Sequence, residues 1–271
     1  MTPFFIDGPN GALFCIHHPA PGGHGPAVLF VPSFAEENNR SRHMVARQAR
    51  ALAAAGIHVL LLDPTGVGDS AGTVADADWQ AWHGDVLAGR DWLKARGHDR
   101  VVLWGLRLGG LLAADVLAKN PAAFAGLLLW QPVVSGGPFL KQFLRLKLTG
   151  DMAHPDSGGE TTQSLKARLA EGETLEIAGY AVSPGLAATL EGLRLADLAP
   201  SGKPAVWLDV AAGEAPVLPP ASDRAVGAWR DAGVPVVAEA VAGPPFWTLQ
   251  EPEWSDALID RTTALAGEAW P

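Results

Sequence analysis

Four short apolar runs constrain the fold of this chain more than any other feature. They read AVLFV, IHVLLL, VVLW and GLLLW, and helical patterns lie between them at residues 41–55, 78–96 and 109–120. Gly56 and Gly97 follow the first two patterns, as C′ glycines commonly do. Apolar strands that alternate with helices are typical of a parallel sheet covered on both faces. We therefore expect an α/β fold of right-handed βαβ units.

The alternation of strands and helices stops after Pro132. Residues 135–203 are punctuated by Gly, Pro and Ser, and their pattern is mainly helical, with no clear strand. Two late runs, PAVWLDVA and VPVVAEAVA, predict two more strands, and the end of the chain predicts a last helix. We therefore expect a core of residues 1–134 and 204–271, with residues 135–203 inserted in it as a helical cap.

The third apolar run continues into VVLWGLRLGG, which predicts a strand, a tight turn and the start of a helix. A strand, a Gly-x-Ser-x-Gly turn and a helix form the nucleophile elbow of α/β-hydrolases. Here Arg107 occupies the central position. A guanidinium stays protonated and is not a nucleophile. This turn therefore presents a cation where a serine hydrolase presents a hydroxyl group.

Three segments together resemble the α/β-hydrolase superfamily: the continuous run from FVPSFAEENNRSR to DPTGVGDSAG, the run LWGLRLGG, and the insertion at residues 135–203. Nearly the whole chain resembles one branch of this superfamily, the exosortase A system-associated hydrolase family, second type. Five motifs carry this resemblance: VPSFAEENNRSR, WGLRLGG, LLLWQPVVSG, FLRLKL and GPPFWTLQE. The resemblance implies an α/β-hydrolase fold whose lid is the segment 135–203. It also implies a hydrolase that acts on an ester, thioester or amide bond and is linked to bacterial exopolysaccharide and protein-sorting loci.

A Ser-His-Asp triad is incomplete in this sequence. Its base should be a histidine after the last strand, where the chain reads VAGPPFW. No histidine stands there, because the last histidine of the sequence is His154. The candidates for the acid are Asp209, near the end of PAVWLDV, and Glu214, which follows this run. A hydrolase of this sequence would need other residues, and we consider Ser33 as the nucleophile with Glu36 or Glu37 as the base. Such a glutamate needs a pKa raised by burial or by its neighbours.

Arg107 also supports a second hypothesis, in which the chain binds a ligand without hydrolysing it. A cation at a helix N-terminus is disfavoured by about 0.3–1 kcal/mol, so we expect an acid to hold it: Glu36, Glu37 or Asp69. An anion could compete with this acid for Arg107, because two N–H groups of a guanidinium can donate to two oxygen atoms of a carboxylate or phosphate at once. The other residues expected at this ligand site are Phe34, Leu108, Asp69, Trp130 and Trp247. For the two tryptophans, core packing is the alternative.

Ordinary loop structure is the simpler interpretation of Ser33, and of Ser135, which follows the fourth apolar run and is the other displaced serine. The expected ligand is a small molecule, a glycan or an acyl compound, and it could be anionic. The oligomeric state stays open.

Charge, cysteine content and histidine spacing exclude several classes of protein. The net charge of −9 disfavours binding to nucleic acid. Cys15 is the only cysteine, so no intrachain disulfide can form, and this suits the cytoplasm. We see no signal peptide and no run near the roughly 20 apolar residues of a membrane span. We expect no cofactor and no metal site, because the eight histidines show no His-x-x-x-His spacing or other ligand grouping.

Overall fold

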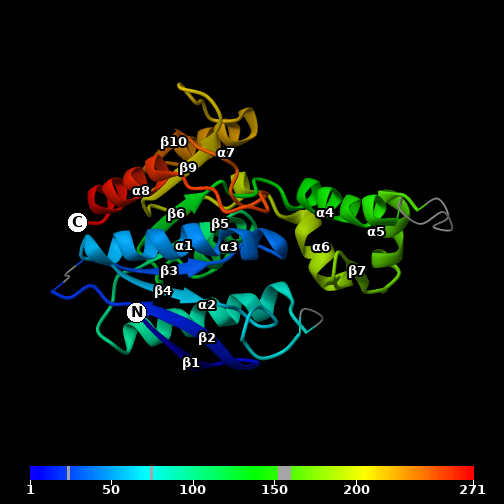
Figure 1. Cartoon of the computed structure of the whole chain (residues 1–271), viewed down its shortest axis with the longest axis horizontal. Helices are drawn as coiled ribbons and strands as arrows, with labels where there is room; N and C mark the ends of the chain where they lie inside the picture. The colour runs from blue at the N-terminus through cyan, green and yellow to red at the C-terminus, as the bar shows by residue number, and fades with distance from the viewer. Residues whose placement is uncertain (23–24, 74–75, 152–159) are drawn as a thin grey trace.

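The computed structural model describes residues 1–22, 25–73, 76–151 and 160–271. A central eight-stranded sheet has the order β1-β2-β4-β3-β5-β6-β9-β10 (Figure 1). Pairing is antiparallel from β1 to β2 and from β2 to β4, and parallel from β4 to β10. The strands are β1 (Thr2–Gly8), β2 (Gly11–His18), β3 (Ala27–Val31), β4 (His58–Leu62), β5 (Val101–Leu106), β6 (Gly126–Trp130), β9 (Ala205–Ala211) and β10 (Val236–Ala242).

Helices cover both faces of this sheet and give the molecule two cores. Apolar residues of α1 and α8 pack in one core, and those of α2, α3 and α7 pack in the other. These helices are α1 (Glu36–Ala54), α2 (Trp79–Lys94), α3 (Leu108–Lys119), α7 (Pro220–Asp231) and α8 (Asp256–Ala269). The predicted α/β architecture, with a mostly parallel sheet between two helical layers, is confirmed.

Some elements were not predicted from the sequence. Strand β1 pairs along the exposed edge of β2, and α7 lies between the two late strands. Helix α1 begins at Glu36, before the expected start at residue 41. The earlier start matters, because it places Glu36 and Glu37 in the first turn of a helix rather than in a loop.

The described residues between β6 and β9 add no strand to the central sheet, and they extend beyond one end of it (Figure 1). This segment contains α4 (Gly136–Asp151), α5 (Thr162–Ala170), α6 (Pro184–Gly192) and a 3₁₀ turn (Leu195–Asp197). The expectation that it has no strand was wrong, because β7 (Leu175–Ile177) and β8 (Tyr180–Val182) form a hairpin. The two residues of its turn, Ala178 and Gly179, both have positive φ, as in a type I′ turn. Three-residue strands and an alanine in that turn give little sequence signal.

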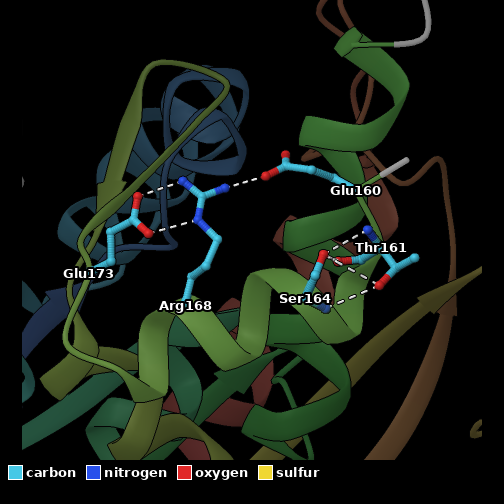
Figure 2. Close-up of polar contacts among 5 residues, drawn as sticks. All are labelled: Glu160, Thr161, Ser164, Arg168 and Glu173. Atoms are coloured by element: carbon cyan, nitrogen blue, oxygen red, sulfur yellow. Dashed lines mark hydrogen bonds and ion pairs between the residues drawn. The ribbon is translucent and has the colours of Figure 1, made fainter. Parts of the chain in front are cut away.

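Helix α5 is fixed at both ends by polar contacts, which Figure 2 shows. At its start, Thr161 and Ser164 each accept a hydrogen bond from the other's backbone N–H, at 3.1 and 2.9 Å, which makes a capping box. Further along the helix, Arg168 pairs with Glu160 and, through Nε at 2.7 Å, with Glu173. The arginine therefore ties together the segments before and after α5.

The first turn of α3 lies very close to the end of β3. A Cβ atom added to Gly109 would lie 2.2 Å from the carbonyl oxygen of Val31 and 2.3 Å from that of Pro32. Both contacts involve backbone atoms, so a side chain can be fitted only by moving the helix or the strand. The position of α3 against the sheet therefore depends on a glycine here.

We predict opposite effects for two glycine-to-alanine substitutions in helices. Gly109→Ala should lower the free energy of unfolding by about 1–3 kcal/mol, because the new methyl group overpacks the β3–α3 contact. Gly227→Ala, in α7 and with no atom near the added Cβ, should raise it by about 0.5–1 kcal/mol. Urea unfolding of both variants tests this, and equal effects would contradict the close approach of α3 to β3.

Candidate functional site

The turn between β5 and α3 keeps the backbone of a nucleophile elbow although it carries an arginine. Arg107 has φ 53° and ψ −119°, a region that costs a non-glycine residue about 1–3 kcal/mol. The turn is tight, because a Cβ atom on Gly105 would lie 2.4 Å from the Cα atom of Gly110. The backbone N–H of Arg107 donates to Trp130 at 3.0 Å, and its carbonyl accepts from Val133 at 3.0 Å. These contacts hold the strained conformation in place.

The guanidinium of Arg107 forms an ion pair with Glu37 in the first turn of α1. Its Nε and Nη2 atoms donate to Oε1 of Glu37 at 3.1 and 3.0 Å, and Nη1 donates to the carbonyl of Gln131 at 3.4 Å. The ring of Trp247 lies against it, with Cζ 5.4 Å from the ring centroid. Both side chains of the pair are largely buried, at 16% and 21% exposed. Of the three acids considered, Glu37 is the one that holds Arg107.

Two buried carboxyl groups surround this single cation. Burial raises the pKa of Glu37, although Arg107 and Arg40 act in the opposite direction. Burial also raises the pKa of Asp209 on β9, against hydrogen bonds from Ser222 and Trp207 and the charge of Arg107. Oε2 of Glu37 and Oδ2 of Asp209 have no hydrogen-bond partner among the described residues. Each of these buried carboxyl groups therefore keeps one oxygen atom without a hydrogen-bond donor in the described part of the chain.

A cavity of about 630 Å³ opens on one side of Arg107. Two further arginines line it, Arg194 beyond the inserted segment's last helix and Arg224 on α7. Both are exposed, and neither forms an ion pair with any acid in the described part of the chain. We call this space the arginine cavity. No sequence signal indicated it, because its three cations come from segments far apart in the chain.

A second cavity, of about 580 Å³, lies on the side of Glu37. Four aromatic residues line it, so we call it the aromatic cavity: Phe34, Phe139, Phe143 and Trp247. Three charged residues line it as well: Glu36, Glu37 and Arg40. Phe139 and Gln142 line the arginine cavity as well. The two cavities therefore adjoin, and each half of the ion pair faces one of them.

The three residues considered for catalysis, Ser33, Glu36 and Glu37, have different surroundings in the structure. Ser33 is buried, its Oγ has no hydrogen-bond partner among the described residues, and it lines a small enclosed space of about 20 Å³ with Phe34 and Leu108. Oε1 of Glu36 accepts from the hydroxyl of Tyr180 at 2.6 Å, and Glu37 is paired with Arg107. Within the described part of the chain, no hydrogen bond joins Ser33 to either glutamate.

Three other residues were considered for the ligand site or as a displaced nucleophile: Trp130, Asp69 and Ser135. Of these, Ser135 alone lines one of the two cavities. Trp130 is fully buried, packs edge-on against Trp104 and donates from Nε1 to Thr262 of α8 at 2.9 Å, so it is a core residue. Asp69 is exposed in the loop after β4. Ser135 forms an isolated β-bridge with Arg194 and lines the arginine cavity.

The histidines of this chain lie away from Arg107 or outside the described residues. Trp247 occupies the segment after β10 where a triad would place its histidine. The expectation that no histidines group together was wrong, because one ring nitrogen each of His17, His58 and His98 lies within 4.8 Å of the others. These three were missed because about 40 residues of sequence separate each from the next. Two of the eight lie outside the described residues: His24 and His154.

We predict that the Arg107–Glu37 pair is energetically coupled. Arg107→Met should lower the free energy of unfolding at pH 7 by about 1–3 kcal/mol, because it leaves a buried carboxylate without its cation. Adding Glu37→Gln should recover part of the loss. The loss should shrink as the pH falls through the raised pKa of Glu37, since a neutral carboxyl group needs no cation. Urea unfolding across a double-mutant cycle measures this, and strictly additive effects would contradict the pairing.

Comparisons with known proteins agree with the fold of this chain. Solved structures with similar folds include Est1E from Butyrivibrio proteoclasticus with ferulic acid bound (TM-score 0.65, 16% identity, 98% of this chain and 96% of that one). They also include a proline iminopeptidase of Mycobacterium smegmatis (TM-score 0.62, 16% identity, 99% of this chain and 98% of that one). A third is mouse alpha/beta hydrolase domain-containing protein 10 (TM-score 0.58, 16% identity, 99% of this chain and 98% of that one). A search of the curated proteins found no match.

No helix in the described part of the chain is long and apolar enough to cross a membrane.

The similar structures have the α/β-hydrolase fold, and the strand order and parallel pairing of this chain agree with it. The family model described as Serine aminopeptidase, S33 (Hydrolase_4) matches residues 24–171, which is more than half of the chain. The chain therefore belongs to this α/β-hydrolase family.

Proposed function

We propose that this protein binds an anionic ligand at Arg107 and uses no nucleophile at its elbow. One observation carries the proposal: a strained elbow aims a guanidinium, instead of a hydroxyl group, at a cavity that two unpaired arginines also line. Backbone strain of this kind persists only where the surrounding structure enforces it, and it clusters at functional sites. The elbow therefore supports a role for Arg107 in binding.

The hydrogen bonds of Arg107 leave room for a ligand. A guanidinium has five N–H donors, and the contacts to Glu37 and Gln131 use three of them. The remaining donors, with Arg194 and Arg224, suit a carboxylate or phosphate group. Glu37 would hold the cation until an anion displaces it.

The aromatic cavity supports a ligand with an apolar part. A compound with its acid group in the arginine cavity could place an acyl chain, an aromatic ring or the face of a sugar among Phe34, Phe139 and Trp247. Est1E, which has a similar fold, binds ferulic acid, an aromatic acid. The resemblance to exosortase A system-associated hydrolases favours a ligand from bacterial exopolysaccharide metabolism. The single buried cysteine suits the cytoplasm as its location.

We predict that an aromatic acid stabilises the protein through Arg107. Ferulic acid at pH 7 should raise the melting temperature, and its neutral methyl ester should not. Arg107→Ala should abolish the shift. The control is Glu239→Gln, which breaks the more exposed Arg261–Glu239 pair between α8 and β10. This variant should keep the shift. A shift retained in Arg107→Ala would contradict an anion site at the elbow.

The affinity for an anion should depend on pH through Glu37. Below its raised pKa, Glu37 is neutral and releases Arg107, so the affinity should increase as the pH falls. An aryl sulfonate is a suitable probe, because it stays ionised over this range. Titration calorimetry should show tighter binding by Glu37→Gln at pH 7 and a smaller pH dependence in that variant, where Asp209 is the other buried carboxyl group that the charge of Arg107 acts on. Weaker binding by Glu37→Gln would show that the carboxylate supports the ligand rather than competing with it.

Hydrolysis by displaced residues is the second candidate function. Membership of a hydrolase family favours it, and so does Ser33, whose buried Oγ has no hydrogen-bond partner among the described residues. Fluorophosphonate labelling followed by peptide mapping separates the two functions. We expect no adduct on Ser33 or Ser135, since no histidine or free carboxylate among the described residues is hydrogen-bonded to either. An adduct on Ser33 that Glu36→Ala or Glu37→Ala abolishes would make this protein a serine hydrolase with a displaced nucleophile.

A further inference from the structure

Three histidines from distant parts of the chain meet at the edge of the sheet opposite Arg107. His17 lies near the end of β2, His58 begins β4, and His98 lies in the connection between α2 and β5. One ring nitrogen of each lies within 4.8 Å of one ring nitrogen of the others. We propose that these three side chains form a binding site for a divalent transition-metal ion, Zn²⁺ above all.

The register of two strands brings the first two histidines together. Strands β2 and β4 are antiparallel, with His17 opposite Leu60. Directly opposite residues share a face of the sheet, and so do residues two apart on one strand. His17 and His58 are therefore diagonal neighbours on the same face, with ring centroids 5.6 Å apart.

Two similar helix ends position His58 and His98. Gly56 after α1 and Gly97 after α2 both have positive φ. At each end, the N–H of the glycine bonds to the carbonyl three residues earlier, and the N–H of the next residue bonds to the carbonyl five residues earlier. This is the Schellman motif, which fixes the direction in which the chain leaves a helix. The rings of His58 and His98 lie 4.3 Å apart, centroid to centroid.

The ring nitrogens are suited to a metal. Nε2 of His17 is buried and has no hydrogen-bond partner among the described residues. Burial and the neighbouring histidines lower the pKa of His17 to about 4, and burial lowers those of His58 and His98. Neutral imidazole is the form of histidine that binds metals.

One contact must change when a metal binds. The backbone N–H of Ala20 donates to Nδ1 of His58 at 3.3 Å, so in the metal-free protein the ring proton lies on Nε2. Coordination through Nδ1 replaces this hydrogen bond, and coordination through Nε2 moves the proton to Nδ1 and ends it. In both cases a long hydrogen bond is exchanged for a metal–nitrogen bond.

The ligand set determines the class of metal. Imidazole nitrogens suit Zn²⁺, Cu²⁺ and Ni²⁺, whereas Mg²⁺ and Ca²⁺ prefer oxygen ligands. Zinc–nitrogen bonds of about 2.0–2.1 Å in a tetrahedral site place the nitrogens about 3.3 Å apart. The three nitrogens, now within 4.8 Å of one another, must therefore come closer on binding, and the stacked rings of His17 and His58 must turn so that both nitrogens point at the ion. Three protein ligands leave the fourth position to water. The charge of Arg96, which faces His17, should weaken the affinity.

This metal site is independent of the proposed anion site. His58 begins β4, and His98 precedes the start of β5, whereas Arg107 follows the end of β5. The histidines thus lie at the amino ends of the parallel strands and Arg107 at their carboxyl ends. Loss of one site leaves the residues of the other in place.

Direct binding of Zn²⁺ to the full chain, without a histidine tag, tests the proposal. After treatment with a chelator, the protein should bind one equivalent of Zn²⁺ in competition with a chromophoric chelator, and its melting temperature should rise with Zn²⁺ concentration. His17→Ala and His98→Gln should each lower the affinity at least about 100-fold, since each removes a direct ligand. His98→Gln lies in an exposed connection, so it keeps the proposal testable if His17→Ala fails to fold.

The control variant is His43→Ala. His43 lies on α1, where its Nε2 contacts the carbonyl of Glu253, away from the three histidines, so this variant should bind Zn²⁺ as tightly as the wild type. The ¹⁵N shifts of the imidazole rings should change on binding for the three histidines and not for His43. The proposal is overturned if the wild type binds no Zn²⁺, or if His98→Gln binds it with unchanged affinity.

Discussion

The site of this protein depends on the ion pair between Arg107 and Glu37. The guanidinium lies at the N-terminus of α3, largely buried, where the helix dipole disfavours a cation. Glu37, in the first turn of α1, provides the negative charge that makes this position acceptable. The pair therefore joins the first turns of two helices that cover opposite faces of the sheet, and the two cavities lie on either side of it.

The same backbone can serve different chemistry. In a serine hydrolase, the strained elbow exposes a hydroxyl group to a histidine. Here the elbow keeps its strain and its close glycine contacts, while Arg107 replaces the nucleophile and Trp247 follows the last strand in place of the base. The family and the fold therefore do not determine the activity, which depends on the side chains at the site.

The sequence predicted the fold better than the site. Apolar strands and C′ glycines such as Gly56 are local signals, so the βαβ units could be located from the sequence. Short strands such as β7 have no such signal, and neither does the edge strand β1. The elbow arginine was evident from one motif, but its partner Glu37 had to be selected from three acids, and only the folded chain does that. Cation groupings such as Arg194 with Arg224 arise from topology alone.

Helix α1 connects the two ends of the molecule. Its first turn carries Glu37, and the chain leaves its last turn directly toward His58. A helix of 19 residues is about 28 Å long, and this one is packed along its length against the sheet and α8. A displacement of Glu37 along the helix axis would therefore move the other end as part of the same rigid body. One rigid helix thus spans the distance between the carboxyl and amino ends of the parallel strands, although the two sites at these ends share no residue.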